Sequence, residues 1–356
     1  MKILFDFQTA VGGLNTGVGI YTANLAAALQ AELEADLVLA RRTTDAPIRT
    51  IPERLKWEQW GLLNEIRRHK PDVVHSPGFT SPRAYRGPLV VTAHDIAIFK
   101  NPHWMRSPLA RYYWKDLTVA TYRRATRVIA VSAYTKRNLV ETLGLPDEKV
   151  AVVHSGVPAD CRKVEGAADR VEKKWGVRDF ILFVGTFEPR KNVSGLLDAY
   201  LFYRQGGGKA PLVMAGGGQG AYADQIRRLL APHIEAGTIR STGFLARGDL
   251  IDLYSAARVL LFPSLEEGFG FPALEAMACG CAVIVSKQDP FLELLGDAAV
   301  FVDPHDAGEM GRALQRLELT AGLRDSLVNK GLACAAQYTW SATATATIAV
   351  YRSALG

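Results

Sequence analysis

The sequence predicts an α/β protein of two doubly wound domains that face each other across a cleft. Short apolar runs, typical of strands buried in a parallel sheet, alternate with helical patterns through the first half of the chain. The alternation begins again after the polar, charged interval Cys161–Lys174, which we expect to be a linker. With 48% hydrophobic residues, a chain of 356 residues can fill two cores. We therefore expect domains at 1–165 and 166–336.

In the first half, the pattern predicts parallel strands separated by helices. Strands are expected at Lys2–Phe7, Asp36–Ala40, Val73–His75, Leu89–Ala93, Val128–Val131 and Val150–His154. Helices are expected up to Leu33 and at Trp57–His69, Leu109–Tyr122 and Ala133–Leu143. The glycine-rich loop Val11–Gly19 follows the first strand. Its glycines lack the G-x-G-x-x-G spacing, so a dinucleotide cofactor is not indicated.

The second half repeats this arrangement. Strands are expected at Phe180–Val184, Leu212–Ala215, Ile239–Thr242, Val259–Phe262 and Cys281–Val285. Helices are expected at Val193–Gln205, Tyr222–Leu230 and Asp249–Ala256. The glycines of Gly216–Gly220 would let a ligand approach the backbone closely, although the segment could also be only a loose turn. Because such folds bind ligands at the carboxyl edge of the sheet, side chains that follow the strands are the site candidates.

Two glutamates, Glu267 and Glu275, stand between the last two of these strands. Pro272 suits the first turn of a helix, so Glu267 lies on a loop and Glu275 lies one turn inside the helix. The backbone N–H groups of the loop and the helix dipole favour phosphate, while the carboxylates can bind hydroxyls. This combination suits a sugar nucleotide. The alternative is a structural turn with two exposed glutamates.

Three further side chains follow strands at the same kind of edge. Arg190 and Lys191 form a cationic pair that suits a diphosphate leaving group, although such pairs are also common on solvated surfaces. His94 follows the strand Leu89–Ala93 and could donate to a sugar hydroxyl, accept a proton or bind phosphate. A structural histidine capped by Asp95 is the alternative.

The positive charge lies in the first half of the chain. Residues 1–165 carry 23 Lys and Arg against 16 Asp and Glu, whereas the remainder has a net charge of −1. The excess gathers at 100–127, interleaved with Trp, Met and Tyr, and could hold the protein on anionic lipid. A solvated helix with a packed aromatic face is the alternative. No nucleic-acid motif accompanies the patch, so no nucleic-acid partner is expected.

The remaining composition predicts a cytoplasmic protein, or one peripheral on the inner face of the membrane. No apolar run is long enough to span a bilayer, and Asp6 and Gln8 interrupt the first apolar run, which therefore reads as a strand rather than a signal peptide. The four cysteines show no metal-binding spacing.

Four segments together resemble the family 4 retaining glycosyltransferases: His94–Phe99, Val131–Lys136, Gly185–Asn192 and Glu267–Glu275. The resemblance runs through essentially the whole chain in order. It implies the GT-B fold, with two Rossmann-like domains, the acceptor on the first, the nucleotide-sugar on the second and no required metal or cofactor. It also implies that the segment 337–356 forms a helix that packs back on the first domain.

The resemblance further implies the roles of individual residues. Arg190 and Lys191 would neutralise the donor diphosphate, Glu267 would contact the donor sugar, and His94 would reach that sugar from the first domain. These four are the expected catalytic residues. The expected donor-binding set adds Gly13, Gly243, Phe244, Gly268, Phe269, Gly270 and Glu275.

The sequence of Gly185–Asn192 most resembles the mannosyltransferase branch of this family, which builds surface polysaccharides. This resemblance favours GDP-mannose as the donor and a glycan or polyprenyl-linked oligosaccharide as the acceptor. Other readings remain: a UDP- or dTDP-sugar donor, a nucleotide-sugar epimerase, or a scaffold that binds nucleotide-sugar without catalysis. A glycosidase also uses two carboxylates, but its leaving group does not call for a cationic pair.

Overall fold

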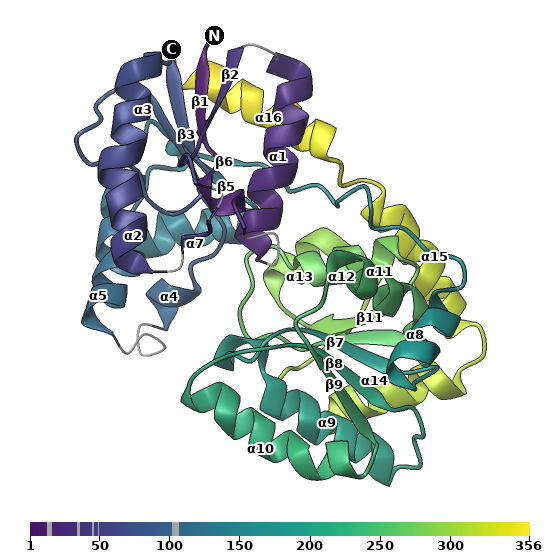
Figure 1. Ribbon diagram of the computed structural model, residues 1–356. Helices are drawn as coiled ribbons and strands as arrows, with labels where there is room; N and C mark the ends of the chain where they lie inside the picture. The colour runs from purple at the N-terminus through teal and green to yellow at the C-terminus, as the bar shows by residue number, and fades with distance from the viewer. Residues whose placement is uncertain (13–15, 34–35, 45, 49, 102–106) are drawn as a thin grey trace. The chain divides into compact units, whose positions relative to one another are not determined.

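The chain forms two compact units in the computed structural model of Figure 1, which describes residues 1–12, 16–33, 36–44, 46–48, 50–101 and 107–356. Unit 1 comprises Met1–Gly156 and Tyr338–Gly356, and unit 2 comprises Val157–Gln337. The boundary thus lies between 156 and 157 rather than between 165 and 166. The reason is that Asp160 and Cys161 are hydrogen-bonded to Arg247, which belongs to unit 2.

Unit 1 is built on a six-stranded parallel sheet in the order β2-β1-β3-β4-β5-β6. Its strands are apolar because they are buried in the sheet. They are β1 (Ile3–Asp6), β2 (Leu37–Ala40), β3 (Val73–Ser76), β4 (Leu89–Ala93), β5 (Arg127–Ala130) and β6 (Val150–Val152). The chain winds outward from β1 in both directions, so the carboxyl end of β1 lies where the strand order reverses.

Helices cover both faces of this sheet, with α1 and α16 on one side and α2 and α3 on the other (Figure 1). The helical segments are α1 (Gly17–Leu33), α2 (Ile51–Lys56), η3 (Trp57–Gly61), α3 (Leu62–His69), α4 (Ala97–Lys100), α5 (Pro108–Arg111), η5 (Tyr112–Leu117), α6 (Thr118–Arg124), α7 (Ala133–Leu143) and α16 (Trp340–Ser353), with the short turns η1 (Gln8–Ala10) and η6 (Asp147–Lys149).

The last helix, α16, is attached to unit 1 by buried polar contacts. His75 lies on β3 and is fully buried, and its Nδ1 is 2.6 Å from the Tyr351 hydroxyl of α16. Its Nε2 is 2.9 Å from the Thr92 hydroxyl. Thr343 donates to the carbonyl of His154 at 2.8 Å. The C-terminal segment therefore completes the core of the first unit.

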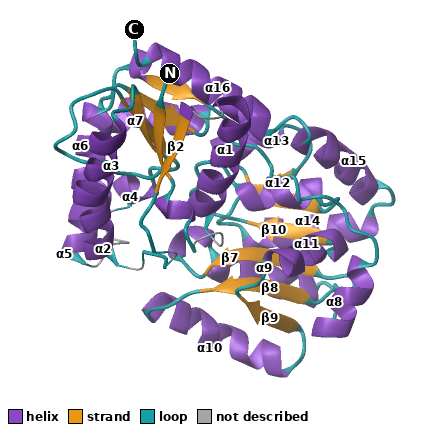
Figure 2. Ribbon diagram, turned by 45° about the horizontal axis from the view of Figure 1, so that its top comes forward, coloured by secondary structure: helices purple, strands orange, loops and turns teal. Residues whose placement is uncertain are grey.

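Unit 2 has the same construction, with a six-stranded parallel sheet in the order β12-β11-β10-β7-β8-β9. Figure 2 shows the strands of each unit as a layer covered by helices. The strands are β7 (Ile181–Thr186), β8 (Leu212–Gly217), β9 (Ile239–Gly243), β10 (Val259–Phe262), β11 (Ala282–Ser286) and β12 (Val300–Val302). Here the strand order reverses between β7 and β10.

The helices of unit 2 pack in pairs, α9 against α14, α8 against α11 and α12 against α15. They are α8 (Ala167–Trp175), η7 (Pro189–Lys191), α9 (Val193–Gln205), α10 (Ala221–Glu235), α11 (Arg247–Ala256), α12 (Phe271–Ala278), α13 (Asp289–Leu295), α14 (Ala307–Leu319) and α15 (Leu323–Ala335). The prediction of a linker at Cys161–Lys174 was wrong, because most of that interval forms α8, which buries Ala167 and Val171 against unit 2.

The large apolar and aromatic side chains of the basic region 100–127 divide between core and surface. Tyr113 and Tyr122 are fully buried, whereas Tyr112 and Leu109 are 43% and 44% exposed. Residues 102–106 of this region lie outside the described residues. None of the helices in the described ranges is both long and apolar enough to cross a bilayer.

Candidate active site

The carboxyl ends of β7 and β10 lie side by side in the middle of the unit 2 sheet, at the point where the strand order reverses. Such a point is where doubly wound sheets bind ligands. The turn after β7 carries Arg190 and Lys191, and the loop after β10 carries Glu267. A backbone hydrogen bond of 2.7 Å from Leu265 to the carbonyl of Arg190 joins the two segments. The fold therefore brings the predicted cations and carboxylate together.

Lys191 and Glu267 form a buried ion pair. The Lys191 Nζ lies 2.5 Å from Glu267 Oε1, and the two side chains are only 7% and 8% exposed. Lys191 Nζ also lies 4.7 Å from the centre of the Phe262 ring, at a distance suited to a cation–π contact. The sequence did not indicate this depth of burial, because adjacent Arg and Lys residues usually lie on the surface.

Arg190 completes the cluster from a more exposed position. Its guanidinium lies 3.4 Å from Glu267 Oε2 and donates to Glu188 at 2.9 Å. Burial alone would raise the pKa of Glu267, but the charges of Lys191 and then Arg190 outweigh it and hold the pKa below its ordinary value. Glu267 is therefore ionised at neutral pH, between two cations that a phosphate could also engage.

Glu275 is held in a separate network on α12. Its Oε1 accepts from Arg247 at 2.7 Å, and its Oε2 accepts from the Tyr254 hydroxyl at 3.2 Å. Arg247 also donates to Asp160 with two nitrogens, each at 3.0 Å. Burial raises the pKa of Glu275, and Arg247 opposes that rise. A ligand hydroxyl at Glu275 would have to join or replace these contacts.

The loop that contains Gly268, Phe269 and Gly270 is buried and ends at the N-cap of α12. Gly270 has a φ of +88°, and a Cβ there would lie 2.4 Å from the Phe291 ring, so only glycine fits. The close packing fixes the backbone beside Glu267. These three residues therefore lie where the sequence placed them, next to the buried ion pair.

Phe244 lies in the loop after β9 at the same edge of unit 2. It is 62% exposed, and its ring is 3.7 Å from the position that a Cβ on Gly217 would occupy, so it covers the end of β8. The preceding residue, Gly243, has a φ of +69°. A solvent-exposed aromatic ring at this edge offers a surface on which a nucleotide base can stack.

His94 belongs to unit 1 and follows β4, as the sequence predicted. Its Nε2 donates to the carbonyl of Pro77 at 2.7 Å, and its ring packs edge-on against Tyr21 and Phe79. Burial lowers the pKa of His94, which makes the neutral form dominant. Because Nε2 carries the hydrogen, Nδ1 is the nitrogen that can accept one. Gly13, the other site residue predicted in this unit, lies outside the described residues.

Sequence reasoning missed several members of the site. Arg247 links Glu275 to Asp160, and Phe262 lies beneath Lys191. Arg247 follows the strand β9 at the ligand edge, a signal of the same kind that identified Arg190. Phe262 ends an apolar strand, and nothing in its sequence position distinguishes it from a core residue. In the part of the chain that the structure describes, no three His, Cys, Asp or Glu residues gather to hold a metal ion.

Comparisons with known families account for both units. Residues 15–160 match the model described as Glycosyltransferase Family 4, and residues 167–333 match the model described as Glycosyl transferases group 1. The two matches meet close to the boundary between unit 1 and unit 2, and the second contains all of the Lys191–Glu267 cluster.

Relatives and solved structures agree with these matches. The O-antigen chain mannosyltransferase B of Escherichia coli is 30% identical over 310 residues, which are 85% of this chain and 77% of that protein. The serotype-specific mannosyltransferase WbdA of Escherichia coli is 30% identical over 72% of this chain, which spans only 32% of that longer protein. A sucrose-phosphate synthase from Thermosynechococcus elongatus superimposes with a TM-score of 0.79 over 99% of both chains, at 20% identity. That likeness shows a shared GT-B fold.

Proposed function

The chain belongs to glycosyltransferase family 4 and is a glycosyltransferase; from this premise we propose that it transfers mannose from GDP-mannose with retention of configuration. The acceptor is a glycan or a polyprenyl-linked oligosaccharide, and the product belongs to a surface polysaccharide. The relation to an O-antigen chain mannosyltransferase over 85% of the chain supports this choice of sugar and pathway.

The buried pair of Lys191 and Glu267, with Arg190 beside it, is the single observation that carries the proposed chemistry. In this proposal, Lys191 and Arg190 bind the diphosphate of the donor and stabilise the negative charge that develops as it leaves. Glu267 binds hydroxyls of the mannose. A cation in surroundings of low dielectric constant stabilises a nearby anion far more than it would in water.

Other residues at the same edge bind the rest of the donor. Phe244 stacks on the base beside Gly243, and Glu275 binds the ribose hydroxyls. Backbone groups of Gly268, Phe269 and Gly270 contact the sugar and the phosphates. These residues lie at the end of β9, in the loops that follow β9 and β10, or in α12, and this position supports the assignment.

Retention follows if the acceptor hydroxyl attacks from the face that the diphosphate leaves. The bond from the anomeric carbon to the phosphate oxygen breaks, and a bond to the acceptor oxygen forms. The departing phosphate oxygen takes the acceptor proton, so no strong protein base is needed. In unit 1, we propose that His94 contacts the transferred sugar through its Nδ1 and that Gly13 contacts the diphosphate.

Thermal unfolding with GDP, UDP, ADP and dTDP, and with their sugars, tests the donor assignment. We expect GDP and GDP-mannose to raise Tm in the presence of a chelator, because the cations of the chain would replace a metal ion. At a ligand concentration 100 times Kd, the stabilisation would be about 2.7 kcal/mol. A shift only with UDP or dTDP would keep the enzyme class and reject the donor. No shift with any nucleotide would reject the donor site itself.

We also propose that unit 1 binds anionic lipid through exposed basic and aromatic side chains. Trp60 is 65% exposed and Tyr112 is 43% exposed. Arg83 links their segments, since its backbone N–H donates to Gln59 at 2.9 Å and its guanidinium lies 3.5 Å from the Tyr112 hydroxyl. Aromatic rings beside arginines suit a membrane interface.

Co-sedimentation with lipid vesicles tests this surface. The protein is expected to bind vesicles that contain anionic phosphatidylglycerol, less at high salt, and not neutral vesicles. Trp60→Ala should weaken that binding, whereas Phe202→Ala, at an exposed aromatic of unit 2, should not. Equal binding by both variants would show that Trp60 does not contribute to lipid binding. If the unchanged protein does not bind anionic vesicles, the proposed lipid-binding surface is rejected.

A further inference from the structure

Arg247 is held in one orientation beside the buried carboxyl group of Glu275. It begins α11, and its side chain is 29% exposed, whereas that of Glu275 is 4% exposed. Its Nη1 donates to Glu275 Oε1 at 2.7 Å, and its Nε and Nη2 donate to the two oxygens of Asp160, each at 3.0 Å. All three nitrogens of the guanidinium are therefore engaged, and this planar group cannot turn without losing several hydrogen bonds.

The same contacts leave Glu275 able to accept further hydrogen bonds. A carboxylate has about four acceptor positions on its two oxygens. In the described part of the chain, Oε1 accepts from Arg247 and Oε2 accepts from the Tyr254 hydroxyl, so about one position on each oxygen remains. These positions match the two neighbouring hydroxyls of a ribose. A protonated carboxyl group would lose part of this capacity, because it would carry a hydrogen of its own.

The groups that face Glu275 differ in their effect on its charge. Arg247 and Tyr254 come from α11, and Asp160 and Cys161 come from the stretch before α8. Burial raises the pKa of Glu275, and Arg247 opposes that rise more than the hydrogen bond from Tyr254 does. The charge of Asp160 raises this pKa further. The cation among these groups is therefore the main influence that favours the carboxylate.

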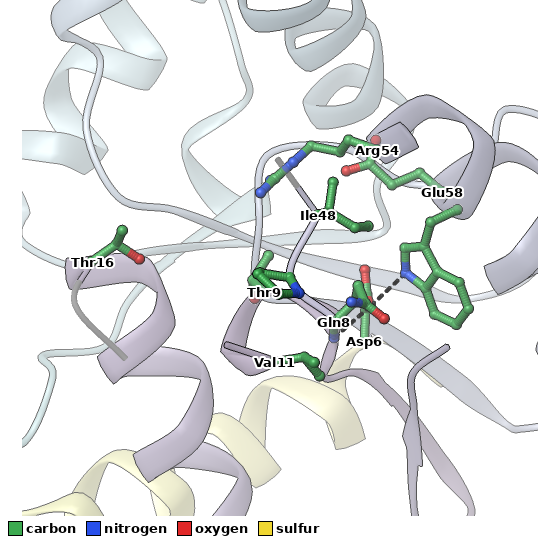
Figure 3. Close-up of a pocket in the computed structure, with 10 residues that line it drawn as sticks. Asp6, Gln8, Thr9, Val11, Thr16, Ile48, Arg54 and Glu58 are labelled. Atoms are coloured by element: carbon green, nitrogen blue, oxygen red, sulfur yellow. Dashed lines mark hydrogen bonds between the residues drawn. The ribbon is translucent and has the colours of Figure 1, made fainter. Parts of the chain in front are cut away.

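Glu58 of unit 1 is a buried glutamate that is held by hydroxyl groups, and it serves as a comparison. It lies in the wall of a cavity of about 110 Å³ at the carboxyl end of β1, which Gln8 and Arg54 also line (Figure 3). Among the described residues, it accepts from the hydroxyl of Tyr113 at 2.6 Å and from that of Thr80. Burial raises the pKa of Glu58 to about 7, although the charge of Arg54 opposes the rise. Such a glutamate is partly protonated at neutral pH.

We infer that Arg247 is a positioning residue of the donor site, which holds Glu275 in its charged form and in the orientation that binds both ribose hydroxyls. The part of Glu275 in ribose binding rests on the proposed function. Without Arg247, Glu275 would resemble Glu58, since it would be buried, held by a tyrosine hydroxyl and open to protonation. Arg247 acts through Glu275 and contacts neither the transferred sugar nor the diphosphate.

Arg247→Gln tests this role, because the amide can still donate to Glu275 but carries no charge. Arg170→Gln is the matched control. Arg170 also pairs with an aspartate through two nitrogens, at 2.8 Å and 2.6 Å from Asp252, and has no contact with Glu275 among the described residues. Arg247→Lys restores the charge without the fork of donors. Thermal unfolding checks that each variant is folded, and Glu275 can take up a proton in Arg247→Gln, which limits the loss of stability.

The first measurement compares the Kd of GDP with that of 2′,3′-dideoxy-GDP by isothermal titration calorimetry at pH 7. Two hydroxyls on a charged acceptor should make GDP bind about 100-fold more tightly, both in the unchanged protein and in Arg170→Gln. In Arg247→Gln this ratio should fall by about tenfold or more. In Arg247→Lys it should also fall, since an ammonium group cannot fix the carboxylate as the fork does. A ratio that stays at the value of the unchanged protein in either Arg247 variant would overturn the inference.

The second measurement repeats this comparison between pH 6 and pH 8, which gives a readout that a merely structural role would not change. A lower pH protonates Glu275 and weakens the binding of GDP, but not that of the dideoxy analogue. Removing the charge of Arg247 raises the pKa of Glu275, so the ratio should be lost at a higher pH in Arg247→Gln than in the unchanged protein. Arg247→Lys should restore the original profile. The same profile in Arg247→Gln and in the unchanged protein would reject the effect on charge and with it the inference.

Failure of this inference can be told apart from failure of the proposed donor site. If the unchanged protein binds GDP but binds the dideoxy analogue equally well, the donor site stands and the inference is rejected. If it binds UDP instead, GDP-mannose is rejected, and the same comparison with UDP and 2′,3′-dideoxy-UDP decides the inference. If it binds no nucleotide, the donor site and the inference are rejected together.

Discussion

Replacing Lys191 with alanine is expected to lower kcat by a factor of about 10² or more. The Lys191 ammonium is buried, pairs with Glu267 at 2.5 Å and lies over the Phe262 ring. Its attraction for the diphosphate grows as negative charge accumulates on the leaving oxygen. The loss should therefore appear in kcat more than in the donor KM. Initial rates of GDP release at saturating GDP-mannose measure it.

Two controls separate this effect from a loss of folding. Lys173→Ala removes the same group at an exposed position of α8 and should leave kcat within about twofold of the unchanged protein. Lys191→Met keeps an unbranched stem against Phe262 and removes only the charge. Breaking a buried ion pair can lower the free energy of unfolding by about 3–5 kcal/mol, so rates are measured well below each Tm. A Lys191→Met protein that is folded and fully active would remove Lys191 from the mechanism.

Replacing Glu267 with glutamine is expected to reduce transfer by a factor of about 10² while the protein stays folded. The amide keeps the shape of the side chain and can still accept a hydrogen bond from Lys191. In the unchanged protein, Lys191 Nζ lies 2.5 Å from Glu267 Oε1. The charge that fixes Lys191 and Arg190 and binds the sugar hydroxyls is lost. Because Lys191 is left buried without its counter-charge, the free energy of unfolding can fall by about 3–5 kcal/mol, so rates are measured well below the Tm of this variant.

Glu188→Gln is the matched control for Glu267. Glu188 also accepts from Arg190, at 2.9 Å, but its side chain is 48% exposed. An exposed ion pair contributes about 0–1 kcal/mol, so this variant should retain transfer within about a few-fold. An equal loss in both variants would mean that the carboxylates act only by holding Arg190. Full activity of Glu267→Gln would reject the proposed sugar contact.

Much of the fold was predictable because parallel strands are buried and read as apolar runs. The strands Leu89–Ala93 and Val259–Phe262 and the helices Ala133–Leu143 and Val193–Gln205 have the predicted bounds. The sequence analysis did not predict that a helix, α2, begins at Ile51, although the capping box of Thr50 and Glu53 indicates a helix start there. The elements after β11, from α13 to α15, were not assigned at all.

The linker prediction at Cys161–Lys174 failed for an identifiable reason. The polar, charged composition of the interval predicts a linker, but Ala167 and Val171 recur at helical spacing and are buried. The charges of α8 form surface pairs, such as Arg170 with Asp252 on α11. Polarity on one face of a helix therefore does not mark a domain boundary.

The sequence could predict only the part of the candidate site that follows from the order of the strands in the sheet. Lys191 and Glu267 are 76 positions apart, yet each follows one of two strands that pair in the sheet. Their burial, the Phe262 ring beneath Lys191 and the Arg247–Glu275 pair depend on packing that no local pattern encodes. The cavity at Gln8 joins three separate segments, from β1, from the stretch after β2 and from α2 with η3, and therefore appears only in the folded protein.

A crystal structure with GDP-mannose, grown in the presence of a chelator, tests the central claim most directly. Our account predicts diphosphate oxygens within about 3.2 Å of Lys191 Nζ and of the Arg190 guanidinium, with mannose hydroxyls on Glu267. A diphosphate bound away from both cations would contradict it. So would a complex that forms only when a divalent metal ion lies between the phosphates and the carboxylates.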